Sequence, residues 1–187
     1  FPTRRSSDLY PYFSEYGLMK YRVWIEVEYF LFLSDKKFFK LPAGLRKKLQ
    51  SAAAHFSVTD AVAIKKIEST TQHDVKAVEY FLKEILDSSK AGELKEWIHF
   101  GLTSQDINNT AVPLLWKHAL ENEYLPNLLN LIRQLKILAT AWKDISMLAR
   151  THGQPASPTR LGKEIMVFVE RMENQIDQLI FIPVSAK

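Results

Sequence analysis

The stretch Ala149–Arg160 reads ARTHGQPASPTR and separates two long segments whose apolar residues recur at helical spacing. It contains two prolines and one glycine, which interrupt regular backbone, and its pattern fits neither a helix nor a strand. We therefore expect His152 to lie on a fixed loop between rigid helices, a position typical of binding and catalytic groups. The alternative is a plain helix connector with an ordinary surface histidine, and this stretch alone leaves both open.

The segment before this stretch predicts a long helix from Gln105 to about Ile145. Its apolar residues recur every three or four positions, as they do along one face of a helix. Proline has no N–H and cannot continue the helical hydrogen bonds. We therefore expect a kink at Pro113 and consider a break near Pro126.

The segment after the stretch predicts another helix, with Ser157 as its N-cap and Pro158 as its first residue. Its apolar residues form the seam of a helical bundle. The seam consists of Leu161, Ile165, Phe168, Val169, Met172, Ile176, Leu179 and Ile180. No segment of the chain alternates long enough to indicate a sheet, so the predicted fold class is all-α.

The first half of the chain predicts shorter helices. Apolar periodicity indicates helices at Leu18–Leu33, Leu45–His55, Asp60–Glu68 and about Asp74–Ser88. The first of these is rich in aromatic residues, which we interpret as packed core because buried aromatics are far more often core than a ligand box.

Three regions follow from these patterns. The leader Phe1–Leu9 has no periodicity and is interpreted as foreign sequence. Residues 10–92 predict an N-terminal helical domain that ends at the linker Lys90–Gly92. Residues 93–187 predict the first part of a truncated central bundle, because the chain stops in the loop-like Ile182–Lys187.

Composition narrows the function classes. The 187 residues carry 25 Lys and Arg against 21 Asp and Glu, a net charge of +4, with a pI of about 9.2. The positive charge is scattered, which argues against a nucleic-acid stripe but favours an anionic substrate. The absence of cysteine excludes disulfides and thiolate zinc sites and fits a cytoplasmic protein. No apolar run reaches the roughly 18 residues of a membrane span.

Two further breaks in the helical pattern carry histidines. His73 follows hydroxyl residues at a predicted helix start, which Thr71 or a neighbour can cap. His99 precedes Thr103 and Ser104, which mark the start of the next helix, where hydroxyls and amides can hold a carboxylate. Ordinary capping turns without a ligand are the alternative at both places.

Several kinds of catalytic site are excluded because their sequence motifs are absent. No ligand spacing such as H-E-x-x-H is present, so a zinc site is not expected. The sequence also lacks a glycine-rich phosphate loop and a G-x-S-x-G elbow. Acid–base chemistry on an anionic substrate remains.

The same stretches resemble a known family. His99–Thr110, HFGLTSQDINNT, and Arg150–Ala156, RTHGQPA, are similar to the first two signature regions of the fumarase/aspartase superfamily. Thr71–Tyr80, TQHDVKAVEY, narrows the match to the branch that acts on purine nucleotides. The resemblance extends from about Tyr10 to Lys187.

This resemblance implies an all-α, cytoplasmic homotetramer built around a central helical bundle. It implies release of fumarate from two succinylated nucleotides of purine biosynthesis, one giving AMP and the other aminoimidazole carboxamide ribotide. The partner is thus a small-molecule nucleotide, and no nucleic acid, membrane, metal or organic cofactor is implied.

The resemblance also assigns residue roles. His152 matches the general acid that protonates the departing nitrogen, with Gln154 as an orienting neighbour. Thr103 and Ser104 match residues that hold a substrate carboxylate, and His99 lines the phosphate or succinyl side. A further substrate-contacting stretch consists of Gln72, His73 and Asp74.

Two family features are not found at their usual places. An Arg-Tyr pair is expected near the N-terminus, where the leader Phe1–Leu9 stands. The general base is expected on a serine-bearing loop beyond Lys187, so we expect the chain to be inactive alone. The competing hypotheses are a non-catalytic helical oligomerisation module and another fumarate-releasing lyase of the superfamily.

Overall fold

A computed structural model describes residues 8–186 of the chain. The expected foreign leader therefore lies outside the described residues, except for Asp8 and Leu9. Two compact units are present: unit 2 is Leu120–Pro183, and unit 1 comprises the chain up to Ala119 together with the last residues from Val184. The domain boundary at Lys90–Gly92 stays a prediction.

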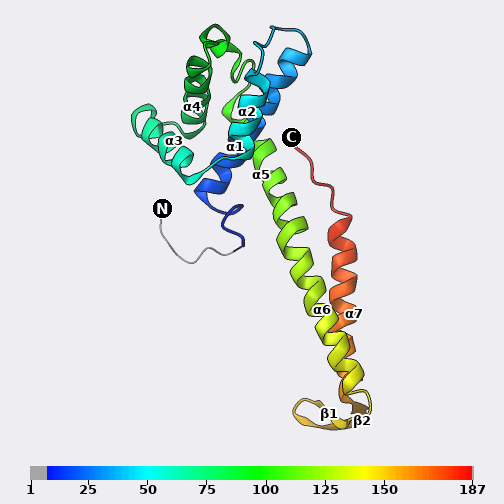
Figure 1. Ribbon diagram of the computed structural model, residues 1–187. Helices are drawn as coiled ribbons and strands as arrows, with labels where there is room; N and C mark the ends of the chain where they lie inside the picture. Colours follow the sequence, from blue (N-terminus) through cyan, green and yellow to red (C-terminus); the bar gives the residue numbers. More distant parts are fainter. Residues whose placement is uncertain (1–7, 187) are drawn as a thin grey trace. The chain divides into compact units, whose positions relative to one another are not determined.

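Helices make up unit 1, as the all-α prediction requires (Figure 1). They are α1 Glu15–Asp35, α2 Leu45–Ala54, α3 Val58–Thr71, α4 Asp74–Ser88, the 3₁₀ helix η1 Gly92–Trp97, and α5 Ser104–Ala119. The predicted bounds of α4 agree with those of the structure, and α1, α2 and α3 differ from prediction by a few residues at their ends.

Helix α1 forms the centre of the unit 1 core. Val23, Val27 and Phe30 of α1 are at most 1% exposed and pack in one cluster with Leu49 of α2 and Leu82 of α4. Complete burial of such a side chain contributes about 1.5–3 kcal/mol. The interpretation of the α1 aromatics as core therefore holds for Phe30.

Polar contacts tie α1 to α5 as well. The Tyr21 hydroxyl lies 2.9 Å from His118 Nδ1, and the His118 ring stacks on Trp24. Burial raises the pKa of Tyr21 to about 12. His118 thus has a structural role in helix packing.

Unit 2 consists of a helix pair and a hairpin (Figure 1). Its elements are the π-helix η2 Leu120–Tyr124, α6 Leu125–Ala141, the strands β1 Ser146–Thr151 and β2 Gln154–Arg160, and α7 Leu161–Ile180. The helix is not broken near Pro126: the π-helical turn η2 continues directly into α6, and the proline occupies the first turn of α6. The predicted helix to Ile145 is wrong in its end, because α6 stops at Ala141.

The hairpin corrects two predictions. Ala149–Arg160 was expected to be neither helix nor strand, yet most of it pairs as antiparallel β1 and β2, with a bulge between Leu148 and Arg150. Ser157 and Pro158 do not start the last helix: both lie in β2, and α7 begins at Leu161 after its N-cap Arg160. Proline is tolerated here because each strand of a two-stranded sheet has a free edge.

Close backbone approach joins α6 to α7. A Cβ on Gly162 would lie 2.2 Å from the Ala139 carbonyl oxygen, so only glycine fits without displacement. The Gly162 N–H donates to the Trp142 carbonyl at 3.1 Å, and Ile132 and Ala139 of α6 and Val169 of α7 are buried. Within residues 8–186, no helix is long and apolar enough to cross a membrane.

Candidate active site

His73 connects the starts of α4 and α5. It is the N-cap of α4, and its Nδ1 accepts a hydrogen bond from the Lys76 N–H at 3.2 Å. In the neutral ring the proton therefore resides on Nε2, which lies 3.5 Å from the Ser104 hydroxyl oxygen. The cap that the sequence assigned to Thr71 or a neighbour is thus the histidine itself.

Asp74, the first residue of α4, is held from α1. Its Oδ2 lies 2.7 Å from Nη2 of Arg22, whose Nε donates to the Asn108 side-chain oxygen at 2.9 Å. Partial burial raises the pKa of Asp74, but the Arg22 guanidinium and the Val75 N–H outweigh it, and the pKa lies below its ordinary value. Arg22 itself is buried, so one cation fixes the N-terminal ends of both α4 and α5.

Thr103 precedes α5 and is engaged within its own turn. Both its N–H and its hydroxyl donate to Oδ2 of Asp106, at 2.6 and 2.7 Å. These bonds lower the pKa of Asp106. The capping arrangement that the sequence offered as an alternative for Thr103 is therefore present, while Ser104 faces His73.

His99 lies in a buried cluster of charges. Its Nδ1 lies 2.6 Å from Glu26 Oε1 on α1, within hydrogen-bond distance, and its Nε2 lies 3.9 Å from Glu79 Oε1 on α4. Glu79 also accepts from Lys76 Nζ at 2.8 Å. Burial raises the pKa of Glu26, and the hydrogen bond to Glu26 raises the pKa of His99.

One face of α4 joins these contacts. His73, Lys76 and Glu79 are three residues apart and therefore neighbours along the helix surface. Their partners are Ser104 at one end and His99 at the other. The structure thus brings His73, Asp74, Ser104 and His99 to the same end of unit 1.

Gln72 is adjacent to this face but contacts its own helix. It closes α3 in a left-handed conformation with φ of 53°, and its side-chain amide donates to the Ser69 carbonyl at 2.7 Å. Its side chain is exposed, and its expected contact with substrate stays a prediction.

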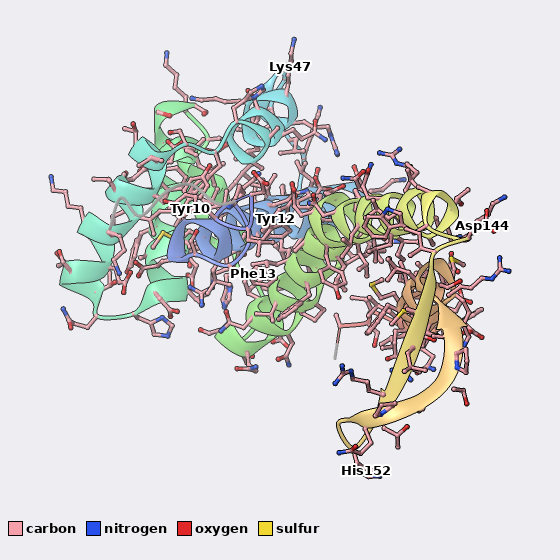
Figure 2. The ribbon with its side chains drawn as sticks, turned by 90° about the horizontal axis from the view of Figure 1, so that it is seen from below. Tyr10, Tyr12, Phe13, Lys47, Asp144 and His152 are labelled. Atoms are coloured by element: carbon pink, nitrogen blue, oxygen red, sulfur yellow. The ribbon has the colours of Figure 1, made fainter. Side chains whose placement is uncertain are left out.

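His152 belongs to unit 2 and lies at the tip of the hairpin (Figure 2). Thr151 pairs with Gln154, and the two residues between them have φ of 52° and 77°, as a type I′ turn requires. Gly153 makes the second of these angles inexpensive. Both His152 and Gln154 are exposed, so the turn presents the imidazole to solvent on a defined backbone.

Sequence patterns missed the groups that hold these residues: Arg22, Glu26, Glu79 and Asn108. Arg22 and Glu26 are four residues apart within an apolar helix, and charges buried in this way are nearly always paired. That spacing was the available signal, but the partners could not be named without the structure. Among residues 8–186, no three acidic, histidine or cysteine side chains are grouped to hold a metal ion.

A comparison with the sequence models of protein families shows which family the chain belongs to. The sequence model of a family described as lyase matches residues 3–182. The chain belongs to this lyase family. The resemblance indicated by the three histidine stretches is thereby confirmed.

Named relatives within the lyase family make the match more specific. The chain is 51% identical over 176 residues to adenylosuccinate lyase of Dictyostelium discoideum, covering 90% of the chain and 38% of that protein. It is 44% identical over 180 residues to adenylosuccinate lyase of Escherichia coli K12, covering 94% and 40%. The chain thus spans about two fifths of the length of these relatives.

Solved structures of similar fold match most of the chain. A 3-carboxy-cis,cis-muconate lactonizing enzyme from Pseudomonas putida matches with a TM-score of 0.74 at 20% identity, over 91% of the chain and 38% of that structure. A fumarate lyase from Mesorhizobium sp. BNC1 matches with a TM-score of 0.72 at 23% identity, over 91% and 38%. At these identities the likeness concerns the fold alone.

Proposed function

We propose that the protein acts as an adenylosuccinate lyase. It would release fumarate from adenylosuccinate to give AMP, and from succinyl-aminoimidazole carboxamide ribotide to give aminoimidazole carboxamide ribotide. The relatives of that name, at up to 51% identity over 90% of the chain, support this proposal. The three matched histidine stretches support it independently of overall identity.

The observation that carries the proposal is the junction of α4 and α5. His73 and Ser104 stand 3.5 Å apart at the starts of two helices, where partial positive charge favours anions. Arg22 fixes this junction through Asp74 and Asn108. The proposed substrates carry carboxylates and a phosphate, which are the groups such a junction attracts.

The proposed reaction is a β-elimination. A base removes a proton from the carbon next to a succinyl carboxylate, and the electron pair of that C–H bond becomes the new C=C bond of fumarate. The C–N bond breaks, and a general acid protonates the departing nitrogen. Imidazole titrates near neutral pH and suits this acid role, which we assign to His152 with Gln154 as its orienting neighbour.

The remaining roles are those that the resemblance assigns in unit 1. Thr103 and Ser104 would hold a substrate carboxylate, and Gln72, His73 and Asp74 would contact the substrate beside them. His99 would face the phosphate or the succinyl group. The resemblance assigns the base to a serine loop, which is not among the residues described.

Assembly and location are part of the same proposal. We propose a homotetramer in the cytoplasm that joins through the bundle helices. In α6 and α7 many apolar side chains are exposed, including Leu129, Ile137 and Phe168 at 53–60%. Exposed apolar surface of this extent is typical of an interaction site.

Product analysis tests the proposed function. The natural protein that contains these residues is incubated separately with adenylosuccinate, with the succinyl-carboxamide ribotide and with argininosuccinate. We expect fumarate with AMP from the first, fumarate with the carboxamide ribotide from the second, and no product from the third. Fumarate from argininosuccinate alone would assign another lyase activity, and no fumarate from any substrate would favour the non-catalytic helical module.

A further inference from the structure

Glu26 is a charged side chain buried in the centre of α1. Its carboxylate is fully buried, and Oε1 lies 2.6 Å from His99 Nδ1. The backbone N–H of His99 also donates to this carboxylate. Within the described part of the chain, Oε2 has no hydrogen-bond partner, so His99 is the group that compensates the buried charge.

The backbone at His99 is held in an uncommon conformation. Its φ is 60°, the left-handed region that a non-glycine residue adopts at a cost. A hydrogen bond from the Leu102 N–H to the His99 carbonyl closes the following turn, and the Tyr29 hydroxyl donates to the Phe100 carbonyl at 2.9 Å. Glu26 and Tyr29 are three residues apart on α1, so one helix face anchors both sides of the strained residue.

Charges face His99 from three helices. Glu26 contacts it from α1, Glu79 and Lys76 face it from α4, and Asp106 of α5 interacts with it at longer range. Glu26 and Glu79 are both buried, and Lys76 compensates only Glu79 at short range. When Glu26 is ionised, a protonated His99 supplies the positive charge that balances it.

We propose that Glu26 is a positioning residue: its buried carboxylate fixes the His99 ring through Nδ1 and keeps it as an imidazolium whose Nε2–H is presented to an anionic group of the substrate. This inference rests on the proposed function only for the identity of that anion. The contact is the carboxylate–imidazole arrangement that elsewhere selects a histidine tautomer and orients the ring.

The charge state follows from the contacts. Burial raises the pKa of Glu26, and the hydrogen bond to Glu26 raises the pKa of His99 against the opposing effect of burial. The pair therefore retains a proton, and the two groups titrate together. The proton can reside on either group. If it stays on His99, the ring is cationic and both nitrogens are protonated; if it moves to Glu26, the neutral ring carries its proton on Nε2.

Histidine NMR distinguishes these states in the 187-residue chain without substrate. The ring nitrogens of His99 are assigned by their loss in His99→Gln and followed through a pH titration. We expect the imidazolium of His99 at about pH 7, a midpoint above the ordinary histidine value of 6.5, and the Nδ1–H tautomer above the midpoint. In Glu26→Gln the midpoint falls by about one pH unit or more, because an adjacent carboxylate shifts a pKa by roughly 1–3 units.

Glu28→Gln is the matched control, because Glu28 is an exposed glutamate of the same helix. It should leave the His99 midpoint unchanged. A His99 midpoint that is equal in Glu26→Gln and the wild-type chain would overturn the proposal. If Glu26→Gln does not fold, the wild-type titration decides, since an Nε2–H tautomer or a midpoint at or below the ordinary histidine value of 6.5 contradicts the proposal. None of these results depends on fumarate release, so a failure here is distinct from a failure of the proposed function.

Discussion

The two units hold their candidate site residues in different ways. In unit 1, His73, Asp74 and His99 each contact a side chain from another helix, at 3.5, 2.7 and 2.6 Å. In unit 2, His152 lies exposed on a two-residue turn, and among residues 8–186 its ring has no hydrogen bond or ion pair. Side-chain contacts thus preorganise the proposed binding groups, whereas the backbone alone positions the proposed acid.

The largest expected effect is on turnover through His152. His152→Ala should lower kcat for fumarate release by about 10²- to 10⁴-fold in the natural protein, because a general acid is lost. Folding stability should fall by no more than about 1 kcal/mol, since the side chain is exposed and only the positive φ of residue 152 disfavours alanine. His55→Ala, another exposed histidine, serves as the control and should retain full activity. Equal kcat values for His152→Ala and His55→Ala would show that the hairpin histidine has no chemical role.

Arg22 should matter most for the stability of unit 1. Arg22→Ala leaves the Asp74 carboxylate and the Asn108 oxygen without their shared donor, and we expect the free energy of unfolding to fall by about 1–3 kcal/mol. Urea unfolding measures this change. Arg46→Ala removes the exposed pair with Asp35 and should cost less than about 1 kcal/mol. Equal losses of unfolding free energy in the two variants would show that buried Arg22 stabilises the fold no more than exposed Arg46.

Gly162 provides the corresponding test in unit 2. Gly162→Ala would place Cβ 2.2 Å from the Ala139 carbonyl oxygen and 2.8 Å from Lys143 Cα, so backbone must move. We expect a loss of about 1–3 kcal/mol, as for overpacked sites, measured by thermal unfolding followed by circular dichroism. An unchanged unfolding temperature would contradict the close approach of α6 and α7.

Gly153 should show a smaller effect, because the same substitution meets no neighbour. No atom lies within 4 Å of a Cβ at Gly153, but its φ of 77° is unfavourable for alanine. The expected cost of Gly153→Ala is about 1 kcal/mol. His152→Asn should be tolerated structurally, since asparagine adopts positive φ readily. A loss for Gly153→Ala as large as that for Gly162→Ala would mean that the turn is packed against other groups.

The smallest expected effect is the pH dependence from Asp74. Its pKa in the folded chain is below the ordinary value of 3.8, so the stabilisation is present above that value and is lost as the pH falls through the lower, folded value. Asp74→Asn should therefore be less stable than wild type at about pH 6 and equally stable well below about pH 3. Urea unfolding at both pH values checks the sign, and a difference that grows at low pH would contradict it.

The sequence predicted the local features of the fold and missed what depends on distant partners. Helix α4 was predictable because its apolar stripe and its capping residues are local. The hairpin was not, because Ser157 and Pro158 fit a helix start as well as a free strand edge. Apolar spacing alone cannot decide between these two uses of proline.

The same distinction applies to the site. His73, His99 and His152 were identified from polar breaks in the helical pattern, and their substrate roles stay predictions. Arg22, which holds Asp74, and Glu26, which holds His99, lie inside an apolar helix. Their importance becomes visible only when α4 and the His99 turn pack against α1. A long-range ion pair leaves no periodic trace in a single sequence.

Hydrogen exchange tests the contrast between the units most directly. An isolated two-stranded hairpin is marginally stable in water, whereas helix starts tied to a buried core open rarely. We expect the amides of Lys76 and Ala77, bonded to His73, to exchange much more slowly than those of β1 and β2. Hairpin amides as well protected as those of α4 would contradict the account, because His152 would then be held by more than its turn.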